Sequence, residues 1–328
     1  MNTVFLTAAA LLTAASALAD DKGTLSLTIE NDSFFGTDRY YTQGTRLQYM
    51  HRPNSIPTFL GNTLTNFAPL GMDVDRTRIG FALGQEFYTP SHVLGFAPIL
   101  TDRPYAGWLH GSFILRRAGV VEPVPALAVQ DEFELDLGVV GPESLSEDTQ
   151  KWWHHMWGYD QPRGWHNQLK TEPVFEIYLN RAYRFGFETK NFWSVECIPH
   201  GKLALGSVYD YAEVGMTLRA GYNLPKEFTR SPLESYSTLP SDNPPSWSAY
   251  LFTGSDGRGV AHNMFLDGNN WRASQSIAKE NLVADFRFGG AIRYKDFELV
   301  ASAVHRTREF KGQIADENFL SITTQWHF

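Results

Sequence analysis

A short polar cluster near the start of the chain holds residue types that bind hard cations. Asn31 and Asp32 end an alternating segment that also contains Glu30, and Thr42 lies in the next such segment. Alternation places the side chain of Asp32 on the same face as that of Glu30. Carboxylate, amide and carbonyl oxygens are the ligands that Ca²⁺ prefers in proteins. The cluster therefore predicts a calcium site that includes Asp32.

Three arginines suggest a different role for Glu30 and Asp32, that of partners in ion pairs. Arg39, Arg46 and Arg78 lie in or beside the first three alternating segments, where they can pair with carboxylates. Membrane barrels have polar interiors in which such ion pairs are common. From the residue types alone, a metal site and a set of ion pairs are both open interpretations.

His154 lies in a segment whose pattern is helical rather than alternating. Ser144 and Glu147 have the spacing of a capping box, and helix-compatible sequence continues to Gly158, a residue type that ends helices. A neutral imidazole can accept a proton from water at physiological pH, and the carboxylate of Asp160 follows nearby. These residues predict a base and a second metal ligand, although a histidine on a helix often serves only in packing.

Alternation of apolar and polar side chains dominates the rest of the chain and predicts an all-β fold. We identify about 12 such segments of about 9–15 residues, close to the length of a tilted strand that crosses a membrane. An even number of strands closes a transmembrane antiparallel up-and-down β-barrel with both termini on one side. The segments begin near Gly23, Tyr40, Arg76, Tyr105, Ala126, Glu172, Asn191, Tyr209, Trp247, Leu282, Asp296 and Asn318.

The last segment favours a membrane barrel over a soluble sheet. Leu320, Ile322 and Trp326 share one face, and the chain ends on Phe328. A final strand of this kind resembles the signal by which outer-membrane barrels are recognised for assembly, so we expect the barrel assembly machinery to bind Phe328. The same pattern also fits the closing strand of a soluble sheet.

The start of the chain predicts export. Residues 4–18 are mostly apolar but too few to span a membrane comfortably as a helix, and Ala17-Leu18-Ala19 is a tripeptide that a signal peptidase accepts. We therefore predict a signal peptide at residues 1–19 and a single barrel domain at residues 20–328. The rest of the sequence contains no run of about 18 apolar residues, so it predicts no helical membrane span. The net charge of −8 argues against a nucleic-acid partner.

Strand order predicts where the polar connections meet. Connections that follow odd-numbered strands of an up-and-down barrel lie at the same end. Residues 31–41, 88–105 and 141–171 follow the first, third and fifth segments, so we expect them to gather on one rim, with a short helix in the last of them. If the amino terminus is periplasmic, this rim is extracellular and lies beside the headgroups of the outer leaflet.

Several common catalytic motifs are absent from the sequence. It contains no Gly-x-Ser-x-Gly, no His-Glu-x-x-His and no Gly-x-x-x-x-Gly-Lys. Serine-hydrolase, zinc-protease and P-loop chemistry therefore lack their usual signatures.

Longer motifs occur in an order that spans nearly the whole mature chain. They are Asn31-Asp32, Tyr41-Thr42-Gln43-Gly44, Gln85-x-x-Tyr88-Thr89-Pro90, Asp102-Arg103-Pro104-Tyr105-Ala106-Gly107-Trp108, Gly141-Pro142, Gln150-x-x-x-His154-x-x-x-Gly158 and Trp165-x-x-Gln168-Leu169. Together they resemble the outer-membrane lipid A 3′-O-deacylase (LpxR-type) family. The resemblance implies an outer-membrane barrel that hydrolyses an ester of lipid A in a calcium-dependent reaction.

The resemblance also implies which residues act. Asn31, Thr42 and His154 match catalytic positions, and Asp32 and Asp160 match positions that hold the metal. The chain departs from the family at two points. The family enzyme has Glu at the Asp160 position, and it has a Lys for which residues 91–94 of this chain offer no counterpart.

The expected reaction is ester hydrolysis without a covalent intermediate. His154 would deprotonate a water that attacks the acyl carbonyl, while Ca²⁺ stabilises the developing oxyanion. Asn31 would donate a hydrogen bond to the same oxygen, and Thr42 would orient a ligand or water. The partners are then lipid A and the surrounding outer-membrane lipids. An outer-membrane phospholipase with the same base and metal is one alternative, and a passive pore or structural barrel is another.

Overall fold

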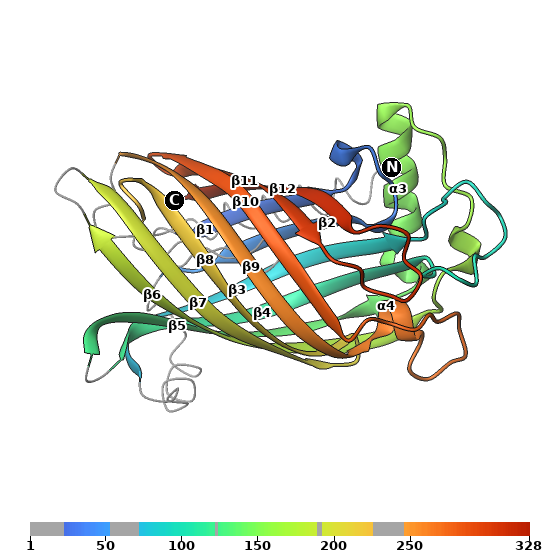
Figure 1. Cartoon of the computed structure of the whole chain (residues 1–328), viewed down its shortest axis with the longest axis horizontal. Helices are drawn as coiled ribbons and strands as arrows, with labels where there is room; N and C mark the ends of the chain where they lie inside the picture. The colour runs from blue at the N-terminus through green and yellow to red at the C-terminus, as the bar shows by residue number, and fades with distance from the viewer. Residues whose placement is uncertain (1–22, 53–71, 122–123, 189–191, 226–245) are drawn as a thin grey trace.

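Twelve antiparallel strands close into a barrel in the part of the chain that the computed structural model describes, residues 23–52, 72–121, 124–188, 192–225 and 246–328 (Figure 1). This confirms the predicted fold class, and the predicted starts agree with the structure to within a few residues. The signal peptide predicted at residues 1–19 lies outside the described residues. The strands are β1 (Thr24–Asn31), β2 (Tyr40–Met50), β3 (Met72–Thr89), β4 (Ala106–Val121), β5 (Val124–Val140), β6 (Glu172–Glu188), β7 (Trp193–Gly206), β8 (Tyr209–Tyr222), β9 (Trp247–Asn263), β10 (Leu282–Tyr294), β11 (Phe297–Arg306) and β12 (Glu317–His327).

The first and last strands close the barrel. β1 pairs with β12 in a continuous register that runs from Thr24 opposite His327 to Asn31 opposite Leu320. At the start of β2, the backbone N–H of Tyr41 donates a hydrogen bond to the carboxylate of Glu317 on β12. The β1–β12 pairing that closes the barrel therefore ends next to the β1–β2 connection. Both described ends of the chain lie at the opposite end of the barrel.

The barrel exposes its apolar face and buries its polar face, the reverse of a soluble protein. Val214, Leu251 and Phe288 are 72 %, 61 % and 63 % exposed, whereas the neighbouring Glu213 and Arg287 are 6 % and 5 % exposed. This arrangement suits an exterior in contact with lipid and a polar lumen. No helix in the described residues is long and apolar enough to cross a membrane.

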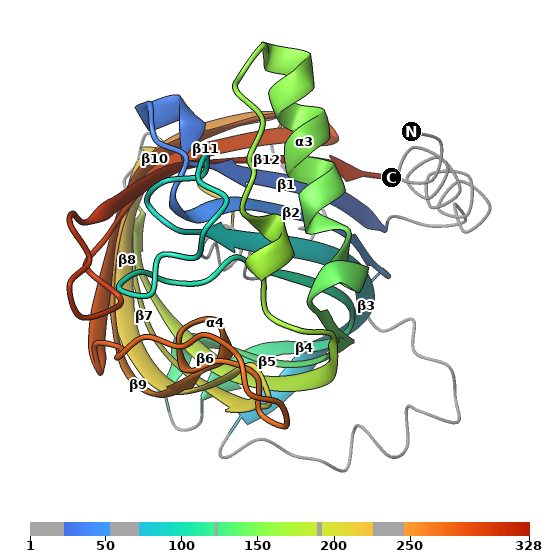
Figure 2. The ribbon, with the colours of Figure 1, turned by 90° about the vertical axis from the view of Figure 1, so that its right-hand side faces the viewer.

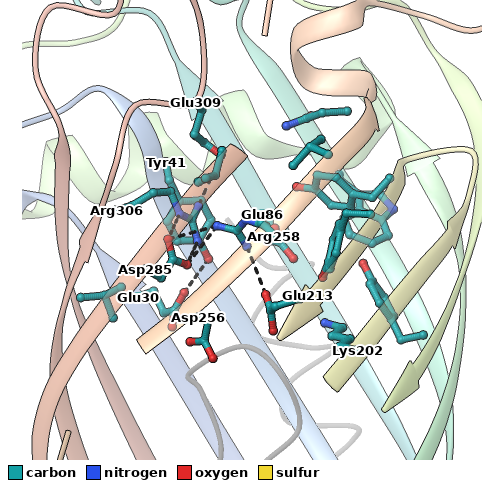
Figure 3. Close-up of a pocket in the computed structure, with 18 of the residues that line it drawn as sticks. Glu30, Tyr41, Glu86, Lys202, Glu213, Asp256, Arg258, Asp285, Arg306 and Glu309 are labelled. Carbon is teal, nitrogen blue, oxygen red and sulfur yellow. Dashed lines mark hydrogen bonds and ion pairs between the residues drawn. The ribbon is translucent and has the colours of Figure 1, made fainter. Parts of the chain in front are cut away.

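Ion pairs fill the lumen. Arg46 lies 2.6 Å from Glu134, so this arginine pairs within the lumen and not with Asp32. Asp285 accepts hydrogen bonds from Arg258 and Arg306 at 3.0 and 2.9 Å, as the close-up in Figure 3 shows. Because these charges have opposite partners nearby, their burial in the lumen does not leave them uncompensated.

Exposed aromatic residues surround the end of the barrel that holds the described chain ends. The rings of Tyr222 and Trp247 are stacked with centroids 4.7 Å apart. Trp326 lies 5.2 Å from the terminal Phe328, whose ring also stacks on Tyr49 at 6.3 Å. Aromatic girdles of this kind mark the level of a membrane interface. The predicted binding of Phe328 by an assembly machinery stays a prediction.

The opposite end of the barrel carries the short helices. They are η1 (Ser33–Phe35), η2 (Pro142–Ser144), α3 (Ser146–Trp157), η3 (Trp165–Asn167) and α4 (Met264–Asp267). Seen from this end, α3 runs across one side of the opening and extends beyond the barrel wall, while α4 lies on the other side (Figure 2). The helix predicted in the connection after the fifth strand is therefore confirmed.

The start of α3 differs from the prediction. Leu145 precedes the helix with φ 61°, and no side chain caps it, so the capping box predicted for Ser144 and Glu147 does not form. Ser144 instead belongs to η2, and its Oγ lies 2.9 Å from Oγ of Ser146. The end of the helix agrees with the prediction, because Gly158 adopts a left-handed conformation with φ 74°.

Candidate active site

One cavity at the helix-bearing rim brings together all five residues predicted for the site. It lies between the β1–β2 connection and α3, and it is lined by Asn31, Asp32, Thr42, His154 and Asp160, among others. The β3–β4 connection completes the lining with Val93 and Leu94. The three polar connections that strand order placed on one rim therefore do meet there.

Asp32 is the most buried acid of this cavity, with 1 % of its surface exposed. Its Oδ2 accepts a hydrogen bond of 2.8 Å from the backbone N–H of Arg39, while its buried Oδ1 has no hydrogen-bond partner. Burial, followed by the nearby charge of Asp38, raises the pKa of Asp32 well above the usual carboxyl range. Among the described residues it forms no ion pair, so a cation ligand would satisfy the orphaned oxygen.

Asn31 and Thr42 hold the backbone around Asp32. The side-chain oxygen of Asn31 accepts a hydrogen bond of 2.7 Å from the N–H of Ser33, the first residue of η1. The hydroxyl of Thr42 lies 2.8 Å from that of Thr89 at the end of β3. Both side chains border the cavity, so their predicted catalytic roles are compatible with their positions and stay predictions.

His154 lies on the buried face of α3, together with Ser146 and Gln150. Its Nδ1 lies 2.5 Å from the carbonyl oxygen of Asp160. Because a carbonyl only accepts hydrogen bonds, this contact assigns the ring hydrogen to Nδ1 and leaves Nε2 as the nitrogen that can accept a proton. Asp160 thus contributes its backbone to the site, and its side chain is exposed.

The sequence interpretation missed a further carboxylate, that of Asp38. Its Oδ1 accepts a hydrogen bond of 2.9 Å from Nε2 of Gln150, and its Oδ2 lies 3.4 Å from Nε2 of His154. Gln150 is in turn oriented by the indole N–H of Trp165, at 2.7 Å. The only sequence signal for Asp38 is its place between Asp32 and Thr42.

Residues 91–94, where the family enzyme has a Lys, contribute an apolar surface here. Val93 is buried, and Leu94 borders the cavity with 37 % of its surface exposed. Among the described residues that line the cavity, none is Lys or Arg. The negative charge of the carboxylates is therefore not balanced by a basic side chain in the lining.

Gly107 allows α3 to approach the barrel closely. A Cβ atom at this position would overlap the hydroxyls of Ser144 and Ser146. We expect Gly107→Ala to shift the start of α3 and, with it, His154. Since a misplacement of about 1 Å can cost about 10²-fold in rate, lipid hydrolysis should fall by about that factor while the heat-modifiable gel mobility of the barrel is retained.

Gly111→Ala is the matched control on the same strand, because the nearest atom to its Cβ is a backbone oxygen at 4.0 Å. Its rate should equal that of the wild type. Equal rates of lipid hydrolysis in the two variants would show that the packing of α3 against Gly107 does not position the catalytic residues.

A second cluster of potential metal ligands lies within the lumen. Ligand atoms of His200, Glu213 and Asp256 all lie within 4.8 Å of one another, and Figure 3 shows Glu213 and Asp256 facing the lumen. However, one oxygen of Asp256 lies 2.6 Å from His200 and the other lies 2.6 Å from Arg287. Because these contacts already satisfy Asp256, the rim cavity with its orphaned oxygen is the better candidate for a cation.

Comparisons with known proteins agree with this architecture. The family described as "Outer membrane protein LpxR" matches residues 3–328, and no curated protein sequence matches the chain. LpxR from Salmonella typhimurium is structurally similar, with a TM-score of 0.74 and 18 % identity over 93 % of this chain and 100 % of that one. The β domain of the Bordetella autotransporter BrkA has a TM-score of only 0.42, with 10 % identity over 93 % of this chain and 97 % of that one. The chain therefore belongs to the LpxR family of outer membrane proteins.

Proposed function

We propose that this outer membrane protein is a calcium-dependent lipid A deacylase that hydrolyses the 3′-acyloxyacyl ester from the extracellular side. The observation that carries the proposal is the rim cavity, in which the buried, unpartnered oxygen of Asp32 and the imidazole of His154 face the same space. Membership of the LpxR family supports the same activity.

The chemistry follows from the positions of the side chains. Nε2 of His154 accepts a proton from the attacking water, while the Asp160 carbonyl holds the ring in the required tautomer. Asp32 and Asp160 are the residues that would hold Ca²⁺, whose contribution is to stabilise negative charge on the acyl oxygen. Asn31 and Thr42 border the same space and are placed to orient the reacting groups.

Exposed apolar side chains around the cavity favour a lipid substrate. Phe34 and Phe35 on η1 are 58 % and 46 % exposed, and they lie between the cavity residues Ser33 and Gly36. On the other side, Trp157 at the end of α3 is 60 % exposed. These residues give the surroundings of the cavity an apolar surface that acyl chains can contact.

Mass spectrometry of lipid A from cells with and without the expressed protein tests the proposal. We expect loss of one ester-linked acyloxyacyl group, abolished by chelation of the purified protein and restored by Ca²⁺. Glycerophospholipid cleavage with intact lipid A would select an outer-membrane phospholipase. Channel conductance without hydrolysis of either lipid would select a passive barrel.

A further inference from the structure

The connection between β1 and β2 places two carboxylates at the same cavity. Asp32 starts this connection and Asp38 lies near its end, and both line the cavity. Their side chains therefore face one space, in which Oδ1 of Asp32 has no hydrogen-bond partner. Two carboxylates that line the same cavity repel each other unless positive charge lies between them.

Positive charge from the protein is scarce at this position. Arg39 is adjacent in the chain, but it gives Asp32 only its backbone N–H, and its guanidinium lies over the ring of Tyr40. The cavity lining contains no Lys or Arg among the described residues. In the described lining, the group that can carry positive charge is His154, which cannot act as a base while it is protonated.

Asp38 is oriented but has a free coordination direction. Gln150 fixes Oδ1 with a hydrogen bond of 2.9 Å. Oδ2 lies 3.4 Å from Nε2 of His154, longer than the ~2.7–2.9 Å of a charge-assisted hydrogen bond. With the ring hydrogen on Nδ1, both Nε2 and Oδ2 present lone pairs toward the same space. A cation bound to Oδ2, or a water that donates a hydrogen to each of them, would relieve this contact.

We propose that Asp38 is a further carboxylate ligand of the divalent cation, so that the β1–β2 connection supplies two charged ligands in addition to Asp160. The inference rests on the cation of the proposed function and adds a residue to its site. Two carboxylates balance the charge of one Ca²⁺, and ligand charge sets calcium affinity. Gln150 then acts as a positioning residue that links the cation site to the helix of the base.

Cation binding to the purified full-length protein in detergent tests Asp38 directly. Tb³⁺ serves as the probe, because Trp153 lines the cavity and can sensitise its luminescence, and Ca²⁺ affinity follows from competition. We expect Asp38→Asn to weaken Ca²⁺ binding by about 10–100-fold, the usual cost of disturbing a metal environment. Asp38→Glu should bind more tightly than Asp38→Asn. Asparagine keeps the size of the side chain and an acceptor for Gln150, so the fold should survive.

Asp148→Asn is the matched control, since it removes one negative charge from an exposed position on α3. If Asp38→Asn binds like Asp148→Asn while Asp32→Asn binds weakly, Asp38 is not a ligand and the inference is overturned. If Asp38→Asn weakens binding but the wild type cleaves no lipid A, the ligand assignment holds and the proposed function fails. A wild type that binds neither Tb³⁺ nor Ca²⁺ overturns the inference, whatever its activity.

Discussion

His154→Gln is expected to lower the turnover of lipid A hydrolysis by about 10²–10⁴-fold, the usual contribution of a general base. The substitution removes the nitrogen that faces the cavity and leaves the carboxylates of Asp32 and Asp38 in place. Calcium affinity should therefore stay near that of the wild type, and added calcium should not restore the rate. Turnover at saturating lipid and saturating calcium is the measurement.

His155 provides the internal control, because it is exposed on α3 next to the buried His154. His155→Gln should retain the wild-type rate. An inactive His155→Gln beside an active His154→Gln would mean that the base has been misassigned. Full activity in both variants would rule out histidine base catalysis at this site.

Asp285→Ala is expected to reduce the free energy of unfolding by about 3–5 kcal/mol, the cost of leaving buried charges without their partner. Asp285 binds both Arg258 and Arg306 within the lumen at distances of 2.9–3.1 Å. Its removal leaves two guanidinium groups close together with only longer ion pairs, Arg258 to Glu213 at 3.9 Å and Arg306 to Glu309 at 3.7 Å. Urea unfolding of the barrel in lipid vesicles measures the change.

Asp296→Ala is the control for this stability effect. Asp296 is an exposed acid in the turn between β10 and β11, and its backbone oxygen, which binds the N–H of His327, is retained. Its free energy of unfolding should match the wild type. A loss of equal size in both variants would assign the effect to net charge rather than to the lumen pairs.

The barrel could be predicted because each strand separates lipid from a polar lumen, which imposes two-residue alternation. In β8, Val214 and Leu218 are exposed to the outside, while Glu213 and Arg219 are buried within. The predicted start of a strand is least accurate where the pairing is irregular. β3 begins at Met72 and not near Arg76, because a register shift after Val74 interrupts the alternation.

The site could be predicted only in part because some of its contacts join distant segments. Asp38 and Gln150 are separated by 112 positions, and Asp38 lies in a connection without periodicity. The start of α3 depends on close packing of Ser144 and Ser146 against Gly107, which no local capping pattern reveals. Asp32 and His154 could be predicted because strand order alone placed their segments on one rim.

Closure of the barrel by its final strand has a consequence for when the protein can act. β12 pairs with β1 up to Asn31, and Glu317 of β12 binds the backbone of Tyr41 next to Thr42. The side of the cavity formed by the β1–β2 connection is therefore held in place by residues of β12, which are synthesised almost last. A chain in transit, whose carboxyl-terminal strand has not yet docked, lacks an assembled centre. If the proposed function holds, lipid hydrolysis is expected only from molecules whose last strand has docked on the first.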